Sequence, residues 1–491
     1  MLDLLTIFAL VAVVLTVSGL ASGIVERAPL SFPIIFLGLG FVLGGHGLGV
    51  IEVGSENASL EAVAFLVLAL ALFLDAMRLR LGEIGAAGLV PMLSLGPGTV
   101  IIILIGALGT YFLLGLSVVE SLLVGTILAS TDPVVLRDVI RNERIPRSVR
   151  RALQIEAGTN DLVVLPVLLL LIAIANSEAG GIVDWLTFVA QVFLLGPLIG
   201  FCVGAAGAWI MGRADAAFGI RREHQALYGI GLVLLAFTAG QLSGGDGFLA
   251  AFAAGFAVAV LNFDLCDCFL EYGETTAEAA MLLAFILFGA VISEIAFEPP
   301  LLPTLLLAAL ILFIARPLAI GIVLRRAAVS RAARAFIGWF GPRGLNSLLL
   351  ALLVVESGVP GAEFLLAVVG VVVTVSVVVH GATATPLSAL YGRTVERMTL
   401  QEERESTAAG LFTHEEGAPR ITPEEIARRL EGPDPPLILD VRTRSQYERD
   451  ATQIPGSVRV PPDQVQDWAM RYLADHPDGE PHLRPIVTYC T

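Results

Sequence analysis

Long apolar segments fill the first 395 residues of this chain and constrain its fold more than any other feature. About thirteen of them reach the roughly 20 residues that an α-helix needs to cross the hydrocarbon core of a bilayer. They lie near residues 3–24, 31–50, 58–77, 84–115, 118–140, 149–175, 183–212, 223–242, 247–264, 275–297, 301–324, 335–356 and 361–391. Charged residues make up only 15% of the chain, against about 25% in soluble domains. The sequence therefore predicts an all-α polytopic membrane protein over residues 1–395.

Arginines in the connecting loops predict the orientation of these helices. Cytoplasmic loops of membrane proteins are enriched in Arg and Lys. With about thirteen spans, all the arginine-rich loops fall on one side of the membrane. These loops contain Arg27, Arg78 and Arg80, Arg137 to Arg151, Arg213 to Arg222, Arg325 to Arg334, and Arg393 with Arg397. We therefore expect a multi-pass protein of the cell (inner) membrane, with its N-terminus outside and its C-terminal domain in the cytoplasm.

Two prolines interrupt the apolar pattern at matching places. If spans one to six and eight to thirteen form two inverted six-helix repeats, the fifth span, with Thr131-Asp132-Pro133, corresponds to the twelfth, with Gly341-Pro342-Arg343-Gly344. Proline removes a backbone donor and breaks a helix. We expect two broken helices that cross in the membrane, where free carbonyls and helix ends can bind an ion. A channel or a receptor would not require such paired breaks.

Carboxylates inside apolar helices mark the expected transport site. Asp132, Glu156 and Asp161 lie in predicted spans, and a carboxylate at bilayer depth costs about 3 kcal/mol on insertion scales. We assign ion and proton transport to Asp161, because a carboxylate that binds either a small cation or a proton couples their movements by competition. A role in helix packing is the alternative. Asn160 is neutral, so this pair has one titrating group, which favours electroneutral one-for-one exchange.

Polar residues next to Asp161 are candidates for assisting roles. Hard cations prefer oxygen ligands, and Thr131 and the carbonyls freed at Pro133 would supply them. Asp132 could bind the ion directly or cap a half-helix, where a carboxylate contributes up to about 1 kcal/mol. Asn160 is expected to orient the neighbouring backbone and could also touch the ion.

Arginines inside the spans are expected to balance the remaining charges. Glu156 needs a cationic partner, and Arg316 in the eleventh span is the best candidate. Losing one member of a buried ion pair leaves an uncompensated charge, so we interpret this pair as structural rather than part of transport. Arg343 is expected to offset negative half-helix ends at the crossing, with a plain interfacial position as the alternative. We expect His46 and His380 to be packing residues rather than proton relays.

Four short motifs in this region together resemble the sodium/proton antiporters of the electroneutral, NhaP-like branch of the cation/proton antiporters. They are Thr131-Asp132-Pro133, Glu156-x-x-x-Asn160-Asp161, Ile314-Ala315-Arg316 and Gly341-Pro342-Arg343-Gly344. The resemblance implies a homodimer whose core domain carries the crossed broken helices and moves like an elevator, without a cofactor. It also implies that Asp161 carries Na⁺ or a proton, that Thr131 and Asn160 assist, and that Glu156 pairs with Arg316.

The resemblance covers about residues 1–395, with one departure from the family pattern. The residue after Glu156 is often a serine that helps to coordinate the ion, and here it is Ala157. The hydroxyl of Thr159 could compensate, although its helical angle differs. This departure leaves the ligand set, and with it the choice of sodium over potassium, open.

A polar C-terminal region follows, with a linker at 396–419 and a small α/β domain at 420–491. Alternating strands and helices predict a small parallel sheet. The segments Leu439-Asp440-Val441-Arg442 and Ile454-Pro455-Gly456 resemble the rhodanese domain. We therefore expect a partial rhodanese-like domain attached to the membrane domain.

The last residues of the chain bear on whether this domain is active. Cys490 matches the nucleophile position of rhodaneses, and the sequence given ends at Thr491. We expect an incomplete domain that does not transfer sulfur. One hypothesis is a selenocysteine codon read as a stop, which an in-frame UGA would support. Cys266 and Cys268 are expected to be incidental thiols rather than a metal site.

The sequence thus predicts a secondary transporter, not an enzyme, that exchanges sodium or lithium for protons and serves pH homeostasis. A potassium/proton antiporter is the alternative within transport. A membrane-anchored sulfurtransferase and a channel are the alternatives from other classes, but a mere anchor has no use for Asp161. Nucleic-acid binding is not supported, because the chain has no basic stripe.

Overall fold

The computed structural model divides the chain into two units, Met1–Gly410 and Leu411–Thr491, which are considered one at a time. It describes residues 10–14, 16–17, 19–20, 31–51, 54, 57–78, 89–142, 145–176, 181–261, 269–270, 274–327, 329–397, 423–430, 432, 435–441, 452–460, 468, 472 and 486–489.

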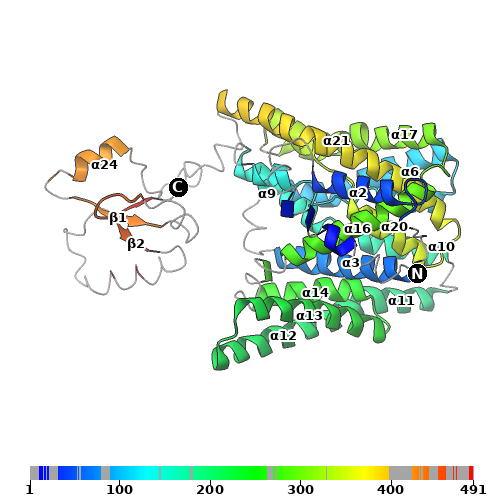
Figure 1. The fold of residues 1–491 in the computed structure, drawn as a ribbon, viewed down its shortest axis with the longest axis horizontal. Helices are drawn as coiled ribbons and strands as arrows, with labels where there is room; N and C mark the ends of the chain where they lie inside the picture. Colours follow the sequence, from blue (N-terminus) through cyan, green and yellow to red (C-terminus); the bar gives the residue numbers. More distant parts are fainter. Residues whose placement is uncertain are drawn as a thin grey trace. The chain divides into compact units, whose positions relative to one another are not determined.

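The regular elements described in the first unit are all helices (Figure 1). In chain order they are α2 (Phe32–Leu43), α3 (Ala58–Arg78), α5 (Leu89–Leu93), η1 (Ser94–Gly98), α6 (Thr99–Leu114), α7 (Val118–Ile127), α8 (Arg137–Arg141), α9 (Arg147–Thr159), α10 (Asp161–Ala175), α11 (Ile182–Ala190), η2 (Gln191–Leu195), α12 (Gly196–Phe218), α13 (Arg222–Leu242), α14 (Gly247–Leu261), α16 (Glu274–Ile295), α17 (Leu301–Ala309), η4 (Leu310–Ala315), α18 (Arg316–Val323), η5 (Leu324–Arg326), α19 (Arg331–Trp339), α20 (Leu345–Glu356) and α21 (Ala362–Arg397).

Eight helices among the described residues are long and apolar enough to cross a membrane, counting uninterrupted neighbours such as α9 and α10 as one. Four shorter apolar helices, α2, α7, α14 and α20, accompany them. The unit is therefore a polytopic membrane domain, as predicted. The count of about thirteen spans and the inverted repeats stay predictions.

Two spans are interrupted where prolines occur beside a charge. Helix α7 ends at Ile127, and the backbone is not helical again until α8 begins at Arg137. Helix α19 ends at Trp339, and α20 begins only at Leu345. Proline disfavours helical backbone at the residue before it and cannot donate into the ladder. Continuous helices over 118–140 and 335–356 are therefore replaced by helix, non-helical segment and helix.

Other prolines are accommodated without ending their helices. Pro97 lies within the π-helix η1, while Pro197 and Pro317 lie two residues after the ends of η2 and η4. The wider π turn relieves the clash between a proline ring and the preceding turn. The long span predicted at 361–391 continues unbroken as α21 through Pro386.

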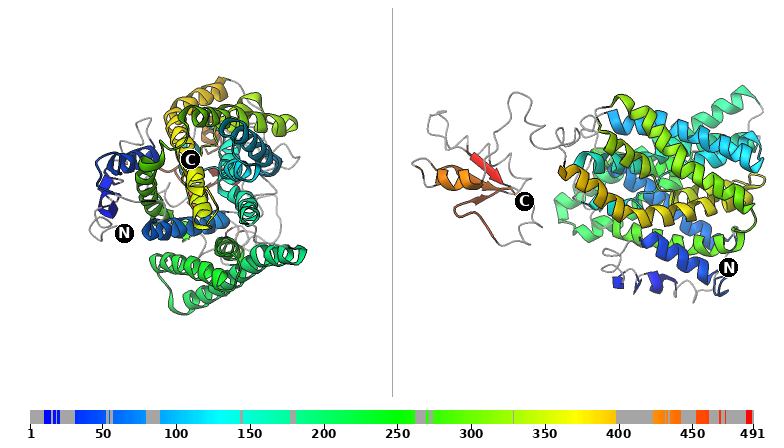
Figure 2. Two further views of the ribbon diagram at one scale, coloured as in Figure 1. Left: turned by 90° about the vertical axis from the view of Figure 1, so that its right-hand side faces the viewer. Right: turned by 90° about the horizontal axis from the view of Figure 1, so that it is seen from above.

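Small residues bring neighbouring helices into close contact. Helices α12, α13 and α14 lie side by side along one edge of the bundle (green; Figures 1 and 2). Between α12 and α14, Gly200 and Gly204 lie directly against the backbone at Ala250 and Ala254. At Gly125 of α7, an added Cβ would lie 2.6 Å from the carbonyl oxygen of Ile103 in α6. Small residues permit such approach where lipid provides no hydrophobic driving force between helices.

In the described part of the second unit, a helix accompanies a parallel sheet. Helix α24 (Pro423–Leu430) precedes three strands, β1 (Leu437–Asp440), β2 (Val458–Arg459) and β3 (Ile486–Tyr489), in the order β2-β1-β3. Leu439 pairs with Val458 on one side and with Thr488 on the other. The central strand β1 is the most buried, as expected for a parallel sheet. Cys490 and Thr491 lie outside the described residues, as do Cys266 and Cys268.

Candidate ion-binding site at two broken helices

The two interrupted segments contact each other inside the first unit. The backbone N–H of Asp132 donates to the carbonyl oxygen of Pro342 at 3.0 Å. The guanidinium Nη1 of Arg343 donates to the carbonyls of Ala129 and Ser130 at 2.7 and 2.9 Å. These carbonyls follow the end of α7, where the helix dipole is negative. Arg343 is only 1% exposed, so the geometry favours its predicted role at a half-helix end over an interfacial position.

Asp132 joins the same two segments through its carboxylate. Its Oδ1 accepts from the N–H of Val134 at 2.7 Å, and its Oδ2 accepts from the N–H of Leu345 at 2.6 Å. Leu345 is the first residue of α20, whose unpaired N–H groups favour an acceptor. At Gly344 a Cβ would overlap the Asp132 carboxylate, so only glycine permits this approach. Of the two roles predicted for Asp132, the contacts favour capping.

Asp161 lies between the two interruptions. It begins α10, directly after Asn160, and is 3% exposed. Its Oδ1 accepts from the Ser130 hydroxyl at 2.6 Å, and its Oδ2 accepts from Nδ2 of Asn346 at 2.7 Å. Ser130 comes from the first interruption and Asn346 from the start of α20. Both broken helices therefore supply one neutral donor to the carboxylate that we predict as the ion and proton carrier.

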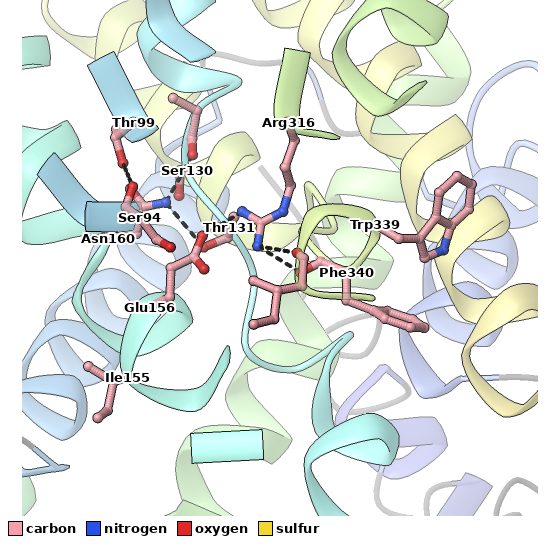
Figure 3. A network of polar contacts seen from close by, with 12 residues as sticks. Ser94, Thr99, Ser130, Thr131, Ile155, Glu156, Asn160, Arg316, Trp339 and Phe340 are labelled. Atoms are coloured by element: carbon pink, nitrogen blue, oxygen red, sulfur yellow. Dashed lines mark hydrogen bonds and ion pairs between the residues drawn. The ribbon is translucent and has the colours of Figure 1, made fainter. Parts of the chain in front are cut away.

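Asn160 and Thr131 form the next layer of contacts (Figure 3). The Asn160 amide donates to the carbonyl of Ala129 at 3.0 Å and to the hydroxyl oxygen of Thr131 at 3.2 Å. Its other atom, Oδ1, is buried without a hydrogen-bond partner in the described part of the chain. The hydroxyl of Thr159 donates to the carbonyl of Ile155 at 2.7 Å. An unpaired buried acceptor one residue from Asp161 is suited to a bound cation.

Glu156 and Arg316 are in direct contact, as the sequence predicts. Nη1 of Arg316 lies 2.5 Å from Oε1 of Glu156, and both side chains are at most 4% exposed. Nη2 of the same guanidinium donates to the carbonyls of Ile337 and Phe340 at 3.1 and 2.8 Å, at the end of α19 (Figure 3). Arg316 thus joins α9 to the second broken helix.

His380 lies near this ion pair. Its two ring nitrogens are 3.0 and 3.1 Å from backbone carbonyls of α21 and α19, and these contacts support its predicted packing role.

Three residues near Asp161 were not predicted from the sequence as part of the site. They are Ser130, Asn346 and Asp75, all buried. Asp75 lies in α3, where its Oδ1 is 3.3 Å from Nη1 of Arg78. A Cβ added at Gly158 would lie 3.4 Å from the same oxygen, so Asp75 is next to the end of α9. The argument from the cost of a carboxylate in an apolar span applies to Asp75 and would have found it.

A cavity of about 70 Å³ is lined by both Asp75 and Asn346. Its polar lining includes Asp75, Arg78, Arg137, Glu278 and Asn346, and Pro133 and Val134 also border it. Arg137 and Glu278 form an ion pair across α8 and α16. The volume is enough for several water molecules. Because Asn346 both lines this cavity and binds Asp161, the cavity is a candidate access route to the carboxylate.

Two family models match the chain. Residues 10–390 match the transmembrane sodium/hydrogen exchanger model, and residues 422–491 match the rhodanese-like domain. The K(+)/H(+) antiporter NhaP of Alkalimonas amylolytica is 26% identical over 388 residues, which cover 77% of this chain and 65% of that protein. The K(+)/H(+) antiporter NhaP2 of Shewanella baltica (strain OS223) is 28% identical over 392 residues, covering 78% and 66%. The chain thus matches just under two thirds of the length of these relatives.

The fold is also similar to that of a solved structure. The sodium proton antiporter MjNhaP1 from Methanocaldococcus jannaschii aligns with a TM-score of 0.65 at 19% identity, covering 80% of this chain and 100% of that one. This similarity shows a shared fold. The resemblances to NhaP antiporters and to rhodanese domains that the motifs indicated are therefore confirmed.

Proposed function

The chain belongs to the sodium/hydrogen exchanger family, and from this we propose that it is a secondary antiporter that exchanges a monovalent cation for a proton across the cell membrane. One observation carries the proposal: the carboxylate of Asp161 is buried between two broken helices and is contacted by neutral donors, Ser130 and Asn346. Such a carboxylate is stabilised in the membrane when it holds a proton or a cation. It therefore exchanges one for the other.

The proposed ion ligands surround Asp161. Oδ1 of Asn160 has no partner among the described residues and can accept the cation. The hydroxyls of Ser130 and Thr159 donate their hydrogens and keep free lone pairs, and the hydroxyl oxygen of Thr131 accepts from Asn160 and keeps a second lone pair. Each oxygen therefore remains a possible ligand. This all-oxygen set suits a hard cation such as Na⁺. Thr131 contacts Asn160 rather than Asp161, so we place it at the edge of the site.

Charge balance supports electroneutral exchange. Glu156 is paired with Arg316, and Asp75 is paired with Arg78. Asp132 is held by two backbone N–H groups that stabilise its charge. Asp161 is then the carboxylate left to bind either one monovalent cation or one proton, and the exchange is one for one.

Sodium, or lithium, is the proposed cation, and potassium is the alternative. The relatives from Alkalimonas and Shewanella are named potassium/proton antiporters, which favours the alternative. The structural neighbour MjNhaP1 is named a sodium proton antiporter. We also propose a homodimer with an elevator-like core and a cytoplasmic C-terminal domain that does not transfer sulfur. The N-terminus is proposed to lie outside.

Proton flux in proteoliposomes tests the proposed function. With the membrane voltage clamped at zero, an outward sodium gradient is expected to drive proton uptake against an imposed pH gradient, and a channel would not do this. Lithium and potassium gradients of the same size are compared in parallel to establish the preferred cation. Absence of cation-coupled proton movement with all three ions would show that the protein is not an antiporter of this kind.

Replacing Asp75 tests whether the cavity is the access route. We expect Asp75→Asn to raise the apparent KM for the cation about tenfold, because it leaves the charge of Arg78 unbalanced in the cavity, and a net positive charge lowers the local cation concentration. Glu61→Gln is the matched control, since Glu61 lies on the same helix roughly 20 Å away at 1.5 Å per residue. Initial rates at varied cation concentration give both KM values. Equal KM values for the two variants would place the route elsewhere.

A further inference from the structure

Asn346 contacts Asp161, but the proposed exchange of a cation for a proton gives its amide no role of its own. It is the second residue of α20 and is 3% exposed. Its Nδ2 donates to Oδ2 of Asp161 at 2.7 Å, and the residue also lines the cavity that contains Asp75. Asp161 itself is not among the lining residues of that cavity. Asn346 therefore lies between the access cavity and the carboxylate.

The amide of Asn346 presents the wrong atom for a bound cation in this arrangement. Nδ2 carries hydrogens with partial positive charge, which suit a carboxylate without a cation. A cation on Oδ2 of Asp161 would be repelled by them. An asparagine amide has a carbonyl oxygen opposite its NH₂ group, and its terminal torsion is broad and roughly two-fold. A half-turn of the amide replaces the donor by an oxygen ligand without moving α20.

We propose that Asn346 is a cation ligand and specificity-determining residue of the exchange site, and that its amide reverses between the cation-free and cation-bound states. This proposal rests on the proposed antiport function. In the cation-free state Nδ2 binds Asp161, as in the structure. In the cation-bound state Oδ1 faces the ion, together with Asp161.

The position of Asn346 gives it a direct influence on ion size. The preceding N–H, of Leu345, is bound by Asp132 at 2.6 Å, and this contact holds the start of α20 beside the first interruption. The following side chain, Ser347, donates to the carbonyl of Ile127 at 3.1 Å at the end of α7. An oxygen ligand held on both sides in this way cannot follow cations of different radius freely. The number and strength of such dipolar oxygens discriminates between monovalent cations.

Two apolar variants test this proposal in proteoliposomes. Asn346→Ala removes the amide, and Asn346→Leu removes it while filling a similar volume. For both we expect the apparent KM of the preferred cation to rise at least tenfold and the ratio of sodium to potassium KM to move at least fivefold toward one. The maximal rate should change less than threefold. A purely structural asparagine would alter the rate but not the KM ratio.

Ser357→Ala is the matched control, because it removes a side-chain hydrogen bond at the far end of the same helix, where the Ser357 hydroxyl donates to the carbonyl of Leu353 at 2.7 Å. We expect it to keep the wild-type ratio of KM values. Unchanged ratios in both Asn346 variants would overturn the proposal, as would loss of folding in both, measured by size-exclusion chromatography, while Ser357→Ala folds. If the wild-type protein exchanges none of the three cations, the proposed function itself fails. If the wild type exchanges cations and both Asn346 variants keep its ratio of sodium to potassium KM values, only the proposed role of Asn346 is refuted.

Discussion

Asp161→Asn is expected to abolish cation-coupled proton flux, lowering the rate at least a hundredfold. The substituted amide keeps the shape of the side chain and can still bond to Ser130 and Asn346, which donate to the carboxylate at 2.6 and 2.7 Å. It cannot take up a proton, and it offers a cation no net charge. Both halves of the exchange therefore lose their carrier, while the fold keeps its contacts. Flux is measured in proteoliposomes with sodium, lithium and potassium.

Asp184→Asn is the control for this experiment, since it makes the same chemical change at an exposed residue in the first turn of α11. We expect wild-type flux from this variant and nearly equal melting temperatures for both. Sustained exchange by the Asp161 variant would refute the assignment of the carrier. A large fall in its melting temperature would instead indicate that Asp161 serves helix packing, the alternative that the sequence left open.

Arg316→Met is expected to produce the largest loss of stability, about 3–5 kcal/mol of the free energy of unfolding, as for other broken buried ion pairs. The substitution leaves Glu156 charged and unpaired among buried groups, and it also removes the donors to the carbonyls of Ile337 and Phe340. Thermal unfolding of the purified protein in detergent measures the loss. The double variant with Glu156→Gln should recover at least half of it, because no orphan charge remains.

Arg428→Met is the comparison for the buried pair. Arg428 is paired with Glu425 at 3.1 Å on an exposed helix, where ion pairs contribute little. We expect no measurable change in unfolding for this variant. Additive effects of Glu156→Gln and Arg316→Met, without recovery in the double variant, would show that the two side chains are not energetically coupled.

Some residues could be predicted because their local chemistry, such as a missing backbone N–H or a charge in an apolar span, is evident without the fold. Pro133 and Pro342, each beside a charged residue, indicated the two spans that are interrupted after α7 and α19. Glu156 and Arg316 lie in separate spans, and each requires an opposite charge in a medium without water. Asp161 is prominent for the same reason. These inferences need only the neighbouring sequence and the cost of charge in lipid.

Other parts of the site depend on geometry that local sequence does not specify. Thr131 was expected beside the ion, yet Ser130 is the residue whose hydroxyl reaches Asp161. Ser130 and Thr131 both lie after the end of α7, in a non-helical segment where consecutive side chains point in different directions. Choosing between them therefore requires the path of the backbone. Asn346 and Asp75 come from α20 and α3, far from Asp161 in the chain.

The sequence alone determined that the chain enters a membrane and which two spans are interrupted, and it led to the proposal that Asp161 carries the ion. Hydrophobicity, proline chemistry and the cost of a buried charge act locally, so they can be read along the chain. Only the tertiary structure decided which donors meet Asp161 and which residue lies between it and the cavity beside Asp75. Those contacts join α3, α10, α20 and the segment after α7, and they exist only once these distant segments have packed together.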